Sequence, residues 1–189
     1  PNIVLTAATS SGDYETKTFW SYRIMSDLNA GVGRSDITPP IGIAHAGWGA
    51  QTHQRAESVD MEFCCTALVL AKRDLEIAII DLDLIWLMPE LDNAVREAVF
   101  SGAGIEPSNI RISYSHTHAG PIVDFTWMTE GDELIPPFTG GLPEKVLQAV
   151  LKAQRDMQPV RVGAGRGVSN INVNRRAARS DGSLFCGRN

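Results

Sequence analysis

The sequence contains few cysteines and no long hydrophobic run, and these absences exclude two classes of protein. Three cysteines in 189 residues are too few for a small scaffold held together by disulfides, and a hydrophobic content of 43% is enough to fill one ordinary core. No apolar run approaches the roughly 18 to 20 residues that span a bilayer. Residues 1–30 also lack the basic start and apolar stretch of a signal peptide. We therefore expect a soluble protein of about one domain, with the cytoplasm as the favoured compartment.

An excess of positive charge is also absent. The chain has 17 Lys and Arg against 22 Asp and Glu, a formal net charge of −5, and its basic residues form no stripe. Nothing in this distribution attracts a phosphate backbone. We therefore expect no nucleic-acid partner.

Two of the three cysteines, Cys64 and Cys65, are neighbours within an apolar run that predicts a strand. Adjacent side chains on a strand point to opposite faces, so a disulfide between them would be strained. We expect this pair to pack as small hydrophobic residues.

Hydrophobic patterning predicts an α/β fold, with a mixed β-sheet and flanking helices. Residues 1–30 are polar and show no sustained period, which indicates an arm that precedes a domain over residues 31–189. A short strand is expected from Ala30 to a turn at Pro39 and Pro40, because proline cannot donate to a sheet ladder.

Two apolar runs, Phe63–Ala71 and Leu75–Trp86, predict an antiparallel hairpin with both strands buried on two faces. An amphipathic helix is then expected from Pro89 to the glycines at 102 and 104, followed by a strand over Ile110–Tyr114. This order predicts a strand-helix-strand unit with parallel strands and a right-handed crossover.

The second half of the chain predicts one more helix and one more strand, over Pro143–Asp156 and Val160–Gly163. Before them, Asp124–Gly141 has the composition of a long irregular loop, which in a compact domain is usually functional or disordered. Four apolar residues in or near it can serve either a substrate pocket or the core, and the core is the favoured interpretation: Ile122, Val123, Trp127 and Phe138.

The most informative motif is Ser115–Pro121, with sequence SHTHAGP, which directly follows a predicted strand and holds two of the four histidines. Ligands of open α/β sheets gather beyond the carboxyl ends of parallel strands. If the backbone stays extended, His116 and His118 project to one side and can address one ion or one substrate. Such pairs also occur as surface or hydrogen-bonded structural residues. Two imidazoles do not complete a catalytic zinc site, which usually has three protein ligands and a water.

Two further groups of polar residues accompany this motif. Asp81 and Asp83 lie near the end of the preceding strand and are spaced to face one side, where one of them can orient an imidazole. A carboxylate in water or capping the next helix is the alternative. In Asn170–Arg176, an arginine between asparagines offers donors for an oxyanion, although a solvated turn is the commoner reason for such a segment.

Taken together, these motifs resemble the N-terminal part of the neutral (alkaline, non-lysosomal) ceramidase family of zinc amidases. Gly31–Thr38 resembles the opening Gly-x-Gly-Arg-x-Asp-Ile-Thr of that family, and Ala71–Trp86 resembles its second strand. Ser115–Pro121 is similar to its Thr-His-Thr-His-Ser-Gly-Pro, and Asn172–Arg175 to its Asn-x-Asn-Arg. The four pieces occur in the family order.

The resemblance implies roles for five residues. It implies that His116 is a zinc ligand, and that His118 and Arg175 contact the substrate amide and the charge that develops on it. It also places Asn174 and Asp83 among the residues that bind the substrate. The implied cofactor is Zn²⁺, and the implied substrate is a small N-acyl amide or sphingolipid-like molecule.

The sequence also departs from the family pattern. Ile122 and Val123 stand where glycines usually follow, and Arg176 replaces a serine. His53 lies where the family has a His-x-Arg, and we expect it to make a structural hydrogen bond. The family takes its remaining zinc ligands, a His, a Glu and a Tyr, from later in its catalytic domain, whereas no histidine follows His118 here. We therefore expect a fragment whose partner is the remaining part of that domain; the alternative is a chain that cannot hold zinc in the family manner.

The resemblance implies a zinc-dependent amidohydrolase that cleaves a linear N-acyl amide, of the N-acylsphingosine type, with metal-activated water. Two alternatives remain open at this point. One is a hydrolase of the same kind that acts on another amide, a lactam or an ester. The other is a non-catalytic α/β binding module without a full metal site.

Overall fold

The computed structural model describes residues 27–45, 52–123, 128–163, 165, 167–171 and 176–186. The chain divides into two compact units: Met25–Arg161 forms one, and Pro1–Ile24 with Val162–Asn189 forms the other. Among the described residues, no helix is long and apolar enough to cross a membrane. The arm predicted over residues 1–30 lies almost wholly outside the described residues, and the predicted domain boundaries stay a prediction.

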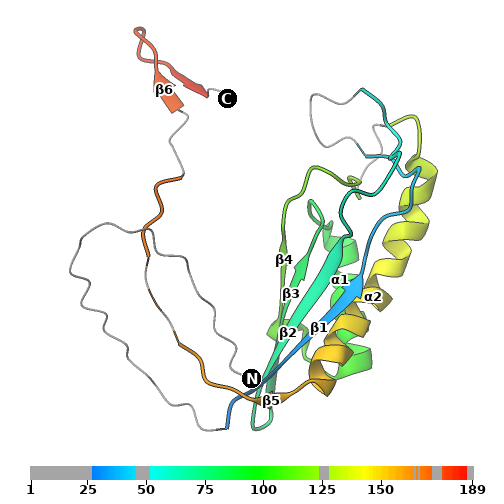
Figure 1. Cartoon of the computed structure of the whole chain (residues 1–189), viewed down its shortest axis with the longest axis vertical. Coiled ribbons are helices and arrows are strands. Elements are labelled where there is room, and N and C mark those ends of the chain that lie inside the picture. Colours follow the sequence, from blue (N-terminus) through cyan, green and yellow to red (C-terminus); the bar gives the residue numbers. More distant parts are fainter. Residues whose placement is uncertain are drawn as a thin grey trace. The chain divides into compact units, whose positions relative to one another are not determined.

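The larger unit is built on a five-stranded sheet with the strand order β4-β3-β2-β1-β5 (Figure 1). The strands are β1 Asn29–Asp36, β2 Cys64–Lys72, β3 Leu75–Leu82, β4 Ile110–Tyr114 and β5 Gln158–Pro159. β3 and β4 are parallel, and every other neighbouring pair in this sheet is antiparallel. This confirms the predicted α/β fold with a mixed sheet and flanking helices.

Helix α1, Pro89–Ala103, connects the two parallel strands and has the predicted boundaries. Proline is tolerated at its start, because the first helical N–H groups have no partner within the helix. At its end Gly104 has φ 73° and donates its N–H to the carbonyl of Phe100 at 2.9 Å. This left-handed conformation is the one that glycine adopts without strain, and it ends the helix there.

Helix α2, Ile135–Arg155, begins well before Pro143, so the start predicted for this helix is wrong. The long irregular loop predicted before it is also wrong from Asp132 onward, where a short 3₁₀ turn, Asp132–Leu134, leads into the helix. The physical reason is burial at helical spacing. Ile135, Phe138 and Leu142 are 7%, 7% and 0% exposed, and they extend the apolar stripe of the rest of α2 towards its start.

Both helices cover the same face of the sheet (Figure 1), and among the described residues of β2 and β3 buried side chains alternate with less buried ones. Along β2, buried Cys65, Ala67 and Val69 alternate with the partly exposed Thr66 and Leu68. The prediction of strands buried on two faces is therefore wrong for the described residues, because a single layer of helices buries alternate side chains only. Cys64 and Cys65 are free thiols on opposite faces, as predicted.

Helix α2 lies unusually close to β1, and two glycines make this approach possible. A Cβ atom at Gly31 would lie 1.9 Å from the carbonyl oxygen of Ala153, and one at Gly33 would lie 2.0 Å from that of Ala149. No side chain fits at such distances. The glycines of the Gly31–Thr38 motif therefore have a packing role.

The strand predicted over Val160–Gly163 is wrong in position. β5 comes just before it, pairs with Asn29 and Ala30, and ends at Pro159. A last backbone hydrogen bond joins the Val160 N–H to the Leu28 carbonyl at 3.0 Å. Beyond it, none of the described residues of the 160–163 segment belongs to a strand.

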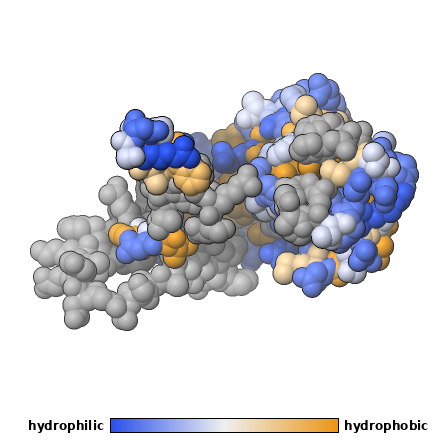
Figure 2. Space-filling view, turned by 90° about the horizontal axis from the view of Figure 1, so that it is seen from above, coloured by the Kyte–Doolittle hydropathy of each residue, from blue (hydrophilic) through white to orange (hydrophobic). Residues whose placement is uncertain are grey.

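The described part of the smaller unit contains an antiparallel hairpin of β6, Arg176–Ala178, and β7, Leu184–Cys186. The Arg179 guanidinium lies 4.8 Å from the centroid of the Phe185 ring. In the larger unit, exposed apolar side chains such as Ile41 and Met61 are scattered. On the face that Figure 2 shows, hydrophilic and hydrophobic residues are interspersed among the coloured residues.

Candidate functional site at one edge of the sheet

The loops that carry the histidines all leave one edge of the sheet. In the strand register, the last residue of β1 lies opposite the first residue of β2. The last residues of β3 and β4 lie beside this position, at the same end of the sheet. The connections after β1, β3 and β4 therefore meet at one end of the sheet (Figure 1). His45 and His53 lie in the first connection, and His116 and His118 follow β4. The topology thus brings all four histidines of the chain to one edge.

The imidazole of His116 is held by the segment that follows β3. Its backbone N–H donates to the Leu84 carbonyl at 3.1 Å, and its ring Nδ1 lies 3.0 Å from the Ile85 carbonyl oxygen. A carbonyl oxygen can only accept, so Nδ1 carries the proton. The neutral ring then presents the lone pair of Nε2, the form in which imidazole binds a metal or accepts a proton.

The backbone at His116 has φ 56°, so the extended conformation expected for the His-Thr-His segment is wrong at this residue. The physical reason is the pair of bonds to Leu84 and Ile85, which turn the chain back over the end of β3. The two imidazoles nevertheless lie together, with His116 and His118 ring centroids 5.1 Å apart and the rings nearly perpendicular. The Trp86 ring lies 5.7 Å from that of His116. The two imidazoles therefore lie together through a backbone geometry other than the expected one, and their shared use by one ion or substrate stays a prediction.

Asp81 and Asp83 both have hydrogen-bond partners at or near this edge. The Asp83 carboxylate accepts the Cys64 N–H at 2.9 Å, and the Asp83 N–H donates to the Cys64 carbonyl at 3.1 Å. The Asp81 carboxylate accepts the hydroxyl of Ser113 at 3.0 Å. Asp83 thus pairs with the backbone at the start of β2, and its role in substrate binding stays a prediction.

His45 and His53 form a second imidazole pair, with ring centroids 5.1 Å apart. An isolated β-bridge between Ala44 and Arg55 positions them. His53 Nδ1 lies 3.3 Å from the hydroxyl of its exposed neighbour Thr52, and a structural role for His53 stays a prediction. His45 Nε2 is buried and has no hydrogen-bond partner among the described residues. Sequence reasoning missed His45, because only the tertiary structure brings its ring to His53.

The loops at this edge are also tied to one another. The Ala44 N–H donates to the Gly131 carbonyl at 2.8 Å, and Arg55 forms an ion pair with Glu133 at 2.8 Å. After β4, Ile122 and Val123 are only 5% and 7% exposed. They and Phe138 therefore belong to the core, as predicted, whereas Trp127 lies outside the described residues.

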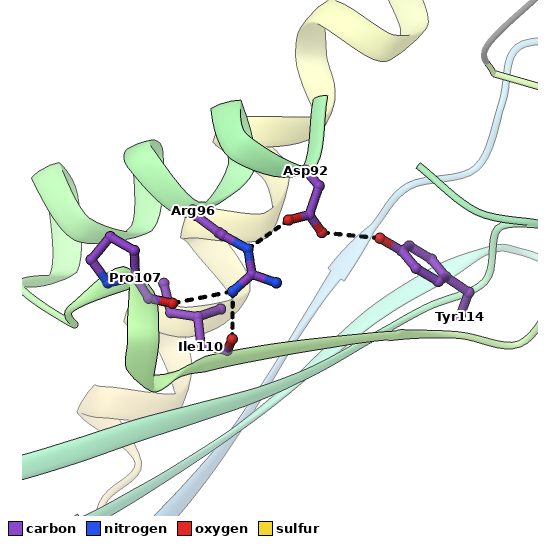
Figure 3. A network of polar contacts seen from close by, with 5 residues as sticks. All are labelled: Asp92, Arg96, Pro107, Ile110 and Tyr114. Atoms are coloured by element: carbon purple, nitrogen blue, oxygen red, sulfur yellow. Dashed lines mark hydrogen bonds and ion pairs between the residues drawn. The ribbon is translucent and has the colours of Figure 1, made fainter. Parts of the chain in front are cut away.

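A network of polar side chains lies between helix α1 and strand β4 (Figure 3). The Tyr114 hydroxyl donates to the Asp92 carboxylate at 3.2 Å, and Arg96 forms an ion pair with the same carboxylate at 2.5 Å. Burial, followed by the negative charge of Asp92, raises the pKa of Tyr114 to about 12. Sequence reasoning missed this network; the i,i+4 spacing of Asp92 and Arg96 was its one visible signal.

The segment Asn172–Arg175 lies outside the described residues, so the roles of Asn174 and Arg175 stay predictions. Within the described part of the chain, no group of three or more His, Cys, Asp or Glu side chains is arranged to hold a metal ion. The lone pair on His116 Nε2 suits one ligand position. Zinc as the cofactor therefore stays a prediction.

Comparison with solved structures finds the same fold in ceramidases. The crystal structure of neutral ceramidase from Pseudomonas aeruginosa and a structure of ceramidase complexed with C2 each match with a TM-score of 0.55 and 17% sequence identity. Each match covers 70% of this chain and 22% of the ceramidase chain, so our sequence spans about a fifth of those proteins. No protein-family model and no curated protein matches the sequence. At this identity the likeness shows the fold.

Proposed function

We infer that this chain carries part of the active site of a ceramidase-like amidohydrolase. The observation that carries the proposal is the His116–His118 pair, which lies where the parallel strands β3 and β4 end. This is the edge at which α/β sheets bind their ligands. The fold shared with neutral ceramidase supports the same class of reaction.

The hydrogen bond from His116 to the Ile85 carbonyl supports a metal-binding role for this imidazole. Metal-binding histidines generally donate their other ring N–H to a carbonyl or a carboxylate, which fixes the tautomer and the orientation of the ring. His116 would therefore hold a zinc ion through Nε2, with further ligands from outside the described residues. When bound, zinc supplies a water of lowered pKa and polarises the substrate carbonyl.

The residues beside His116 would carry out the proton and charge chemistry of amide hydrolysis. Attack on an amide builds negative charge on the carbonyl oxygen and requires a proton for the leaving amine. His118, whose ring lies against that of His116, would supply one of these functions, and Arg175 the other. Asn174 and Asp83 would orient the substrate.

The substrate that we propose is a linear N-acyl amide of a lipid, of the N-acylsphingosine type. A hydrolase of another amide, a lactam or an ester would use the same residues, and turnover of a panel of N-acyl substrates distinguishes these possibilities. A non-catalytic binding module remains the alternative from another class. In that case a purified protein containing this sequence would bind such an amide and release no fatty acid.

The metal content of a purified protein containing this sequence tests the proposal. In His116→Ala we expect the zinc measured by mass spectrometry to fall to a small fraction of the wild-type content, because a ligand is lost. His53→Ala, which also loses one imidazole from this edge of the sheet, serves as the matched control and should keep its zinc. Zinc retained undiminished in His116→Ala would exclude His116 as a ligand.

A further inference from the structure

The strand that presents His116 is held weakly by the sheet alone. β4 has five residues and is the outermost strand on one side of the sheet, so among the described strands it pairs with β3 alone. Short edge strands lack half of the ladder of hydrogen bonds that fixes a central strand. Bonds to a second element would therefore add to the support of β4.

Helix α1 provides this support through one arginine and one aspartate (Figure 3). Arg96 donates through Nη1 to the Ile110 carbonyl, at the start of β4, at 2.5 Å and to the Pro107 carbonyl at 3.1 Å. Asp92, which is ion-paired with Arg96, accepts the hydroxyl of Tyr114, the last residue of β4, at 3.2 Å. Helix α1 is thus hydrogen-bonded to both ends of β4.

The hydrogen bond between Tyr114 and Asp92 completes a closed ring of hydrogen bonds and backbone segments that includes His116. Tyr114 is followed by Ser115, whose N–H donates to the Leu82 carbonyl at 3.0 Å. The next residue is His116, whose ring Nδ1 is hydrogen-bonded to the Ile85 carbonyl. From Ile85 the backbone runs directly into the first turn of α1, which carries Asp92. The hydrogen bond from Tyr114 to Asp92 then joins α1 to the end of β4 and closes the ring.

We propose that Tyr114 and Asp92 are positioning residues for His116: their hydrogen bond fixes the end of β4 relative to the first turn of α1, and so keeps the Ile85 carbonyl on His116 Nδ1. The chemical consequence is the choice of tautomer, since that carbonyl retains the proton on Nδ1 and leaves the lone pair on Nε2. The benefit of this choice to catalysis rests on the proposed function. The positioning itself does not.

Tyr114→Phe removes the hydroxyl and keeps the aromatic ring, so it removes the hydrogen bond to Asp92 with little change in packing. We expect the ratio of the two His116 tautomers, read from the ring ¹⁵N shifts of the histidine-labelled protein, to shift about fivefold towards Nε2–H, the scale of one net hydrogen bond. Asp92→Ala should cause a similar shift. Asp92→Asn, whose amide oxygen still accepts from Tyr114, should largely restore the wild-type ratio.

Ser113→Ala is the matched control, because it removes from the same strand a hydroxyl whose partners, the Asp81 carboxylate and the Ile80 carbonyl, belong to β3 and not to α1. It should leave the His116 shifts unchanged. The proposal is overturned if Tyr114→Phe leaves the tautomer ratio unchanged, or if Ser113→Ala shifts it equally, which would indicate general loosening of the edge strand. The measurement is made on the metal-free protein without substrate, so loss of the proposed function would leave this result standing.

Discussion

The imidazoles of His118 and His116 lie 5.1 Å apart, centroid to centroid, yet we propose different roles for them. Two measurements distinguish these roles. A residue that holds the metal changes metal content, whereas one that stabilises charge on the substrate changes turnover. In His118→Ala and in Arg175→Ala we expect retained zinc, with amidase turnover lowered at least about tenfold, because removing one donor to an oxyanion costs on the order of a hundredfold to a thousandfold. Turnover on a verified substrate and zinc content are the measurements. Unaltered turnover would remove that residue from the mechanism.

Tyr114, the last residue of β4, should make the stability of the protein depend on pH in the alkaline range. Its pKa is raised from 10.0 to about 12, chiefly by burial, so the folded state favours the neutral phenol. Below pH 10 both the folded and the unfolded states hold this proton. Between about pH 10 and 12 the unfolded chain has lost it and the folded chain has not, so the free energy of unfolding falls as the pH rises.

Denaturant unfolding as a function of pH measures this effect. We expect the wild type to lose stability through this range, and Tyr114→Phe to lack that component, since phenylalanine has no proton to release. An equal alkaline loss in both proteins would show that Tyr114 titrates as an ordinary exposed tyrosine.

At the scale of elements, the contact between β1 and α2 depends on glycine. At Gly31 and Gly33 an added Cβ would lie within 2.0 Å of a carbonyl oxygen of α2. Gly31→Ala or Gly33→Ala would have to displace the helix, so we expect a loss of at least about 1 to 3 kcal/mol in the free energy of unfolding. The measurement is urea unfolding.

Two glycines within α2 offer a matched control of opposite sign. A Cβ at Gly140 or Gly141 meets nothing within 4 Å. Alanine has the higher helix propensity, so Gly140→Ala should stabilise the protein by roughly 0.5 to 1 kcal/mol. If Gly31→Ala were as well tolerated as Gly140→Ala, the close approach of helix and strand would be incorrect.

Elements with a clear hydrophobic period could be predicted from the sequence. β2, α1 and β4 formed close to their expected bounds, because each has an apolar pattern bounded by glycine, proline or charged residues. β3 begins at Leu75 as expected but ends at Leu82, so the end predicted at Trp86 is wrong. The start of α2 could not be predicted, because Gly140, Gly141 and Pro143 locally disfavour a helix. Burial of Ile135 and Phe138 against the rest of the core outweighs that local preference.

At the scale of the whole molecule, the core lies in one of the two units. All the buried hydrophobic residues of the described chain fall between Ala30 and Ala153. We therefore expect a shortened protein, residues 25–161, to keep a cooperative thermal transition within a few degrees of that of the whole chain, because hydrophobic burial is the dominant stabilising term. Circular dichroism during heating is the measurement. A shortened protein without a cooperative transition would show that the other unit contributes to this core.

By itself the sequence determined the α/β class, the free cysteines and the placement of a His-Thr-His segment at the end of a strand, since these follow from patterns within a few neighbouring residues. Only the tertiary structure decided which face of the sheet is buried, where α2 begins and which nitrogen of His116 carries the proton. The last of these depends on the Ile85 carbonyl, which the sequence separates from His116 by a whole helix and strand. Local patterns cannot specify such a contact, because the strand pairing that creates it joins residues far apart in the chain.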